Sequence, residues 1–259
     1  MNRNFKQKES HIAKALAADI RYDGRTRNEL RKITIEKGIV ATAEGSARVT
    51  CGNTEIIAGV KLALGTPYSD RPDEGTLMVN CELLPMAHPT IEQGPPSINA
   101  IEISRVIDRG LRETHTIDTK KLCIKEGEQV WSVTVDLVPI NHDGNLIDLG
   151  AIAAIAALED AKMPEIIDGQ ADYKHKGKKS MEIQHKPLPI TVCKIKDQLF
   201  VDPTFAEEAE LDARLTIGIL EEGSICSLQK GGNKGFTHEE LVRAFDMATD
   251  AVDKIRKNL

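Results

Sequence analysis

The sequence contains few aromatic residues, since Phe, Trp and Tyr together make up 3% of the 259 residues. Domains that hold single-stranded RNA on an aromatic platform stack successive bases on such side chains, and this chain has too few of them for a platform of that kind. The chain also lacks an excess of positive charge, because its formal net charge is -6. A free-standing nucleic-acid-binding domain is usually basic. Any contact with RNA must therefore come from a local basic patch.

Long apolar segments and paired cysteines are also absent. The longest unbroken apolar run, LGAIAAIAAL, has 10 residues, which is too short to cross a bilayer. No two of the 5 cysteines lie within three positions of each other, so no CxxC zinc or redox motif exists. The first residues, MNRNFKQKES, do not resemble a secretory signal. We expect a soluble cytoplasmic protein with free thiols and no membrane contact.

Common cofactor and metal motifs are missing. The sequence contains no GxGxxG, no Walker A and no HExxH pattern. We therefore expect neither a cofactor nor a bound metal.

The order of predicted elements favours an α+β fold. Alternating apolar residues in SARVTCGNTEIIAGVKLAL predict strands in hairpins. Strands followed by a helix occur twice, which predicts two layered subdomains of related ββαβα order. The expected division is an N-terminal helix and lead-in (1–30), domain 1 (31–165), a polar connecting loop (166–187) and domain 2 (188–259).

The stretch NHDGNLIDLGAIAAIAALEDA, residues 141–161, is a loop that leads into an alanine-rich helix. A helix start attracts anions because its free N–H groups and its positive dipole end point there. Here the approach contains Asp143 and Asp148 but no Arg or Lys. The stretch is either a phosphate site that has been lost or a site that never bound phosphate.

A row of three arginines, Arg105, Arg109 and Arg112, lies on a predicted helix at spacings of four and three. At 100° per residue they share one face, opposite the apolar residues. Such a row could bind successive RNA phosphates. The alternative is a solvated face in which Asp108 pairs with Arg112 and Glu113 with Arg109.

The segment VDPTFAEEAEL contains three carboxylates, Asp202, Glu207 and Glu208. Carboxylates after a strand could hold Mg²⁺ or act as general acid and base. The favoured alternative is a helix start, with Asp202 as the cap and the glutamates in the first turn.

Three further features have a structural and a functional interpretation each. KHKGKK, residues 174–179, is typical of a surface loop, with RNA contact as the alternative. Arg71, between acidic residues in the 66–75 segment, lies either in an RNA-contacting loop or in a plain turn. His142 beside Asp143 resembles a base with an orienting acid, but a histidine with a structural role in a turn is favoured.

Several motifs resemble the RNase PH family, and within it the non-catalytic RNase PH-type branch of the archaeal exosome. They are DGR (23–25), EGSARVTCGNTEIIAGVK (44–61), EGTLMVNCELLP (74–85), AIEISRVIDRGLR (100–112) and VDLVPINHDGNLIDLGAIAAIAALEDA (135–161). The family degrades RNA from its 3′ end with inorganic phosphate as the attacking group.

The resemblance implies where a phosphate site has been lost. Active members bind phosphate at a Gly-Thr-Arg turn, which here corresponds to Gly144, Asn145 and Leu146. Leucine has no donor for phosphate, and Asp148 nearby should repel it. Two catalytic carboxylates correspond to Asp202 and Glu208, which become vestigial.

The resemblance also implies partners. We expect a heterodimer with a catalytic RNase PH-type paralogue, and three such pairs in a hexameric ring that degrades single-stranded RNA and can carry RNA-binding cap subunits. Arg105, Arg109 and Arg112 would contribute to RNA binding. Two alternatives stay open: an active exoribonuclease that uses Asp202 and Glu208 with a metal, and a pure ring scaffold without RNA contact.

Overall fold

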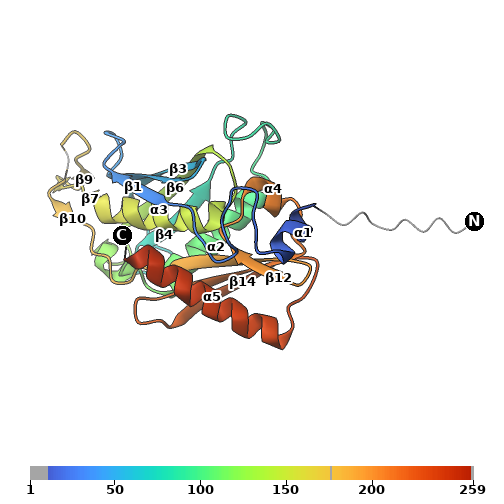
Figure 1. Cartoon of the computed structure of the whole chain (residues 1–259). Coiled ribbons are helices and arrows are strands. Elements are labelled where there is room, and N and C mark those ends of the chain that lie inside the picture. Colours follow the sequence, from blue (N-terminus) through green and yellow to red (C-terminus); the bar gives the residue numbers. More distant parts are fainter. Residues whose placement is uncertain (1–10, 176, 258–259) are drawn as a thin grey trace, which may run out of the picture.

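The computed structural model describes residues 11–175 and 177–257 (Figure 1). It stacks a six-stranded sheet, the helices α2 and α3, a four-stranded sheet and the helix α5 in that order (Figure 1). The helices are α1 (His11–Ala17), α2 (Ile98–Glu113), α3 (Leu146–Asp160), α4 (Phe205–Glu208) and α5 (His238–Arg256), with a short 3₁₀ helix η1 (Thr119–Leu122).

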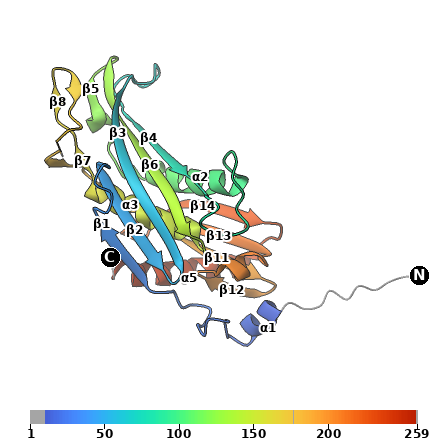
Figure 2. The same cartoon turned by 90° about the horizontal axis from the view of Figure 1, so that it is seen from above.

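The first sheet is formed by β1 (Ile33–Lys37), β2 (Gly45–Cys51), β3 (Thr54–Gly65), β6 (Gln129–Asn141) and β4 (Thr76–Cys81) in that spatial order, with β5 (Cys123–Lys125) paired to the start of β6. Buried and more exposed residues alternate along β2 and β3, so one face of this sheet forms the core. β4 runs parallel to β6, as expected for strands joined through a helix, here α2. The edges of this sheet are β1 and β4 (Figure 2).

Helix α3 is the centre of the molecule. Its residues from Leu146 to Leu158 are buried all round, because one sheet covers each side. Close approach to β2 depends on Gly45, where an added Cβ would lie 2.3 Å from the Ala157 carbonyl oxygen. The two halves of the chain therefore share one continuous apolar core.

The second sheet has the strand order β12 (Gln198–Val201), β11 (Leu188–Ile195), β13 (Ala213–Ile219), β14 (Ile225–Gly232). β11 is buried along its whole length because α3 and α5 cover its two faces. Helix α5 begins with a capping box, in which the Thr237 side chain and the Glu240 side chain each accept from the other's backbone N–H.

The predicted α+β class and the main hairpins are confirmed, but the polar segment 163–187 is more ordered than a plain loop. It forms two small ladders, β7 (Lys162–Met163) with β10 (Lys179–Ser180) and β8 (Ile166–Ile167) with β9 (Gln170–Ala171). The segment is held on the first sheet, where the Gln129 side chain donates to the Gly169 carbonyl. Within residues 11–175 and 177–257, no helix has the length and hydropathy of a membrane span.

Candidate functional site

The start of α3, which the sequence marks as the anion site, is covered by another part of the chain. Gly144 and Asn145 both have left-handed backbone conformations, with φ of 87° and 62°. A Cβ added to Gly144 would lie 2.3 Å from the Pro203 carbonyl oxygen and 2.8 Å from the Phe205 nitrogen. Only glycine fits at position 144. The segment after β12, which contains Pro203 and Phe205, lies directly over the start of α3.

Leu146 does not face an open site. It is 4% exposed and belongs to the central core. Asp148 is 2% exposed, and its carboxylate accepts hydrogen bonds from the Thr191 backbone N–H at 2.9 Å and the Thr191 hydroxyl at 2.6 Å. The carboxylate thus faces β11 and also lies beside the Asn145 side chain, and its repulsion of an anion at the helix start stays a prediction. Burial raises the pKa of Asp148 to about 7, against the effect of these hydrogen bonds.

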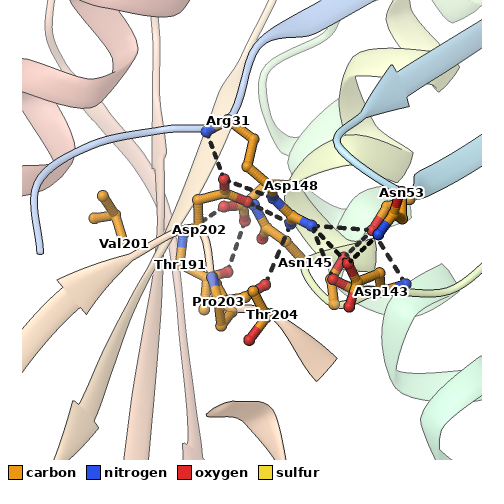
Figure 3. Close-up of polar contacts among 12 residues, drawn as sticks. Arg31, Asn53, Asp143, Asn145, Asp148, Thr191, Val201, Asp202, Pro203 and Thr204 are labelled. Atoms are coloured by element: carbon orange, nitrogen blue, oxygen red, sulfur yellow. Dashed lines mark hydrogen bonds and ion pairs between the residues drawn. The ribbon is translucent and has the colours of Figure 1, made fainter. Parts of the chain in front are cut away.

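Asp202 is fully engaged by hydrogen bonds, and Figure 3 shows Arg31 and Asn145 beside it. The Arg31 guanidinium donates to both carboxylate oxygens at 2.7 and 2.9 Å, and its backbone N–H donates at 2.8 Å. Arg25 and the Asn145 amide add bonds of 2.7 and 2.9 Å. Burial alone would raise the pKa of Asp202, but Arg31 and Arg25 outweigh it and hold the pKa below its ordinary value.

The neighbouring carboxylate Glu207 is also paired. The Arg21 guanidinium donates to its two oxygens at 2.8 and 2.5 Å, and both side chains are buried. Thr204 and Glu207 form the capping box of α4, so the helix start begins at Thr204. The expectation that Asp202 caps this helix is wrong; Asp202 lies two residues earlier, in a left-handed conformation with φ of 51°.

Glu208 contacts the start of α3 from the other side. Its carboxyl group accepts a hydrogen bond of 2.8 Å from the Asn145 backbone N–H. Burial raises the pKa of Glu208 to about 7, against the Asn145 hydrogen bond and the charge of Arg214. The fold thus brings Asp202 and Glu208 together around Asn145.

This arrangement does not favour a metal. Among the described residues, no group of three or more His, Cys, Asp and Glu side chains is arranged to hold a metal ion. The lone pairs of Asp202 that face the site already accept from Arg31, Arg25 and Asn145.

His142 has a structural role in the turn. Its Nδ1 accepts a hydrogen bond from the Gly144 N–H at 3.2 Å, and its ring lies edge-on to Phe205. Burial lowers the pKa of His142 to about 4, and His88 adds to this effect. Asp143 accepts from the Asn53 side chain at 3.3 Å and does not orient the imidazole.

The predicted arginine row lies on the exposed face of α2, apart from the Asp202 cluster. Arg105, Arg109 and Arg112 are all exposed. Arg112 pairs with Asp108 at 2.8 Å and donates to the Leu77 carbonyl at 3.2 Å. Within the described part of the chain, the side chains of Arg105 and Arg109 form neither a hydrogen bond nor an ion pair. The alternative with paired arginines therefore holds for Arg112 alone.

The other basic candidates are exposed. Arg71 lies 3.8 Å from Glu74. In KHKGKK, His175 contacts Asp172 at 2.7 Å and Lys178 lies 3.8 Å from Glu165. Lys176 lies outside the described residues.

Sequence reasoning missed the arginines that engage the carboxylates, Arg21, Arg25 and Arg31. The stretch was assigned to the N-terminal lead-in, and the DGR motif (23–25) entered only as part of the family resemblance. The sequence signal for these residues is the high density of arginines in RYDGRTRNELR, because several arginines in one short segment can form ion pairs with buried acids.

Family models match most of the chain. The 3′ exoribonuclease family, domain 1, matches residues 29–164, and domain 2 of the same family matches residues 185–251. The exosome complex component Rrp42 of Methanopyrus kandleri is 41% identical over 254 residues, which cover 97% of this chain and 95% of that protein. The Rrp42 of Methanothermobacter thermautotrophicus is 44% identical over 237 residues, or 91% and 88% of the two chains.

Solved structures give the same relationship. A chain of the Archaeoglobus fulgidus exosome with RNA bound to the active site superposes with a TM-score of 0.89 at 38% identity, over 95% of each chain. Rice Rrp46 superposes with a TM-score of 0.67 at 20% identity, which supports the fold alone. This chain belongs to the 3′ exoribonuclease family, the RNase PH family.

Proposed function

We propose that this chain is the non-catalytic RNase PH-type subunit of an archaeal exosome, a phosphorolytic 3′→5′ exoribonuclease that acts in the cytoplasm. It would pair with a catalytic RNase PH-type paralogue, and three such pairs would close a hexameric ring. Its own role is to shape the partner's active site and to bind single-stranded RNA there. RNA-binding cap subunits would dock on the same ring.

One observation carries the proposal: the helix start that binds phosphate in active members offers no seat for it here. Leu146, at the position of the phosphate-binding arginine, is buried in the core. The Asn145 N–H is already bonded to Glu208, and the chain after β12 covers Gly144. A reaction that needs a bound phosphate nucleophile has no group here to orient it.

The state of the vestigial carboxylates supports the same conclusion. A general acid or a metal ligand needs free lone pairs. Those of Asp202 are bonded to two guanidinium groups and an amide. Asp202 therefore acts as a structural anion, which argues against an active nuclease that uses Asp202 and Glu208 with a metal.

RNA contact is supported by the exposed arginines of α2. Arg105 and Arg109 present unpaired charge to solvent within the described part of the chain. Guanidinium groups bind phosphate oxygens with high geometric selectivity. Two unpaired arginines on one face favour RNA contact over a pure scaffold.

The test is reconstitution. The purified chain, its paralogue and the mixture are each incubated with single-stranded RNA, with and without inorganic phosphate. We expect degradation by the mixture, only with phosphate, and none by this chain alone. Phosphate-independent RNA loss by this chain alone, abolished by Asp202→Asn, would instead identify a hydrolase.

A further inference from the structure

We propose that Arg214 is a positioning residue for RNA: it draws Glu102 away from the arginines of α2 and so keeps Arg105 and Arg109 available to phosphate. The inference rests on the proposed function, because it requires RNA to bind along this helix. It concerns a residue of the second sheet that does not itself need to touch RNA.

Glu102 lies on the same helix face as the arginines. It precedes Arg105 by three positions and Arg109 by seven. At 100° per residue the three side chains fall within about 60° of one another. A Glu and an Arg at this i,i+3 spacing are neighbours and normally attract each other.

The same helix demonstrates that such pairing occurs. Asp108 and Arg112, at the i,i+4 spacing, form an ion pair of 2.8 Å. Glu102 instead pairs with Arg214 of β13, with 2.6 Å between its Oε2 and the Arg214 Nη2. This contact crosses from the helix layer to the second sheet, against which α2 packs through β14 (Figure 2).

The Arg214 guanidinium is held in place by its surroundings. A Cβ added to Gly231, its cross-strand neighbour on β14, would lie 2.8 Å from Cζ and 3.0 Å from Nε of Arg214. The guanidinium therefore lies directly against the glycine backbone. Glu102 and Arg214 are 28% and 24% exposed at their side chains, so solvent screens the pair less than a fully exposed one.

Loss of Arg214 has two consequences at the RNA path. Glu102 becomes free to pair with Arg105, which removes one phosphate-binding cation. The negative charge of Glu102 also lies beside the face of α2 that the RNA phosphates approach, and it repels them. Both effects vanish when Glu102 is made neutral.

The experiment measures binding of fluorescent single-stranded oligoadenylate to the assembled complex, without phosphate so that the RNA is not degraded. Arg214→Met should weaken binding by about three- to tenfold at low salt, because roughly one phosphate contact is lost. The double variant Arg214→Met/Glu102→Gln should restore affinity to within about twofold of the wild type. Glu102→Gln alone should not weaken binding.

Arg256→Met is the matched control. Arg256 is another arginine that braces the second domain, through bonds to the Lys186 and Ile219 carbonyls. Its loss should leave RNA affinity unchanged.

Three outcomes are decisive. Unchanged affinity in Arg214→Met overturns the inference. A loss that Glu102→Gln does not rescue also overturns it, because Arg214 would then contact RNA itself or merely brace the helix. The double variant Arg105→Ala/Arg109→Ala separates these cases from a failure of the proposed function. If it binds RNA like the wild type, the RNA-binding role proposed for this subunit fails as well. If it loses affinity, only the role of Arg214 is rejected.

Discussion

The Asn145 backbone N–H donates a hydrogen bond of 2.8 Å to the Glu208 carboxyl group. A helix start normally offers such N–H groups to a ligand anion. Here a side chain from the second half of the chain accepts one of them, and the Asn145 amide donates to Asp202 at 2.9 Å. These contacts of Asn145 with Glu208 and Asp202 tie the two halves of the fold together.

Leu146→Arg should not create an active subunit. Because Leu146 is buried, an arginine there must either enter the core or displace the chain around the start of α3. We expect the free energy of unfolding to fall by about 2–4 kcal/mol, with no phosphorolysis by the isolated variant. Urea unfolding and an RNase assay check this, with Leu146→Met as the volume-conserving control. Phosphate-dependent RNA degradation by Leu146→Arg alone would mean that the missing arginine is the only defect.

Asp202→Asn should be a stability variant. It leaves Arg31 and Arg25 partly buried without their counter-ion, and breaking such a pair costs about 3–5 kcal/mol. The exposed pair of Lys125 and Glu128 provides the control, where Glu128→Gln should change the free energy of unfolding by less than about 1 kcal/mol. If Asp202→Asn unfolds like the wild type, Asp202 is not the structural anion that these ion pairs imply.

The three arginines of α2 should contribute unequally to RNA binding. Arg105→Ala and Arg109→Ala should each weaken the affinity of the assembled complex for RNA and lower the salt dependence by roughly 0.7 per lost contact. Arg112→Ala should have the smaller effect, because Asp108 already neutralises Arg112. Affinity measured at several salt concentrations gives both quantities. Equal losses for all three variants would contradict this order.

Asp148 should make stability depend on pH. Its pKa in the fold is about 7, above the ordinary value of 3.8, so the native state binds its proton more tightly than the unfolded chain. The stability contribution of this group is complete below about pH 4 and is lost as the pH rises to about 7. Asp148→Asn removes the titration, so the stability of this variant relative to the wild type should rise by roughly 2–4 kcal/mol between pH 4 and pH 8.

Urea unfolding of both proteins across this range checks the Asp148 prediction. Asp160→Asn provides the control, because the Asp160 carboxylate also accepts a backbone hydrogen bond, from the Ser46 N–H at 3.0 Å, but is only partly buried. A constant difference between Asp148→Asn and the wild type at every pH would show that Asp148 does not titrate in this range.

Local patterns predicted most of the fold. Alternation in β2 and β3, the alanine-rich run of α3 and the capping box at Thr237 each have a short-range signal in the sequence. These features depend on neighbours within a few residues.

Side-chain partners that are distant in sequence could not be predicted. Helical periodicity cannot say that Asp148 faces Thr191, because both flanking sheets are possible neighbours of α3. The arginines that neutralise Asp202 come from a segment more than 170 positions away. The boundaries proposed from the sequence, 31–165 and 188–259, stay predictions.

The most direct test of the central claim is a titration of the isolated chain with inorganic phosphate, followed through the backbone amide NMR signals of Gly144, Asn145 and Leu146. We expect no saturable shift of these signals, because Glu208 and the segment after β12 already occupy the start of α3. Saturable shifts confined to these three amides, with RNA shortened by the same sample, would contradict it.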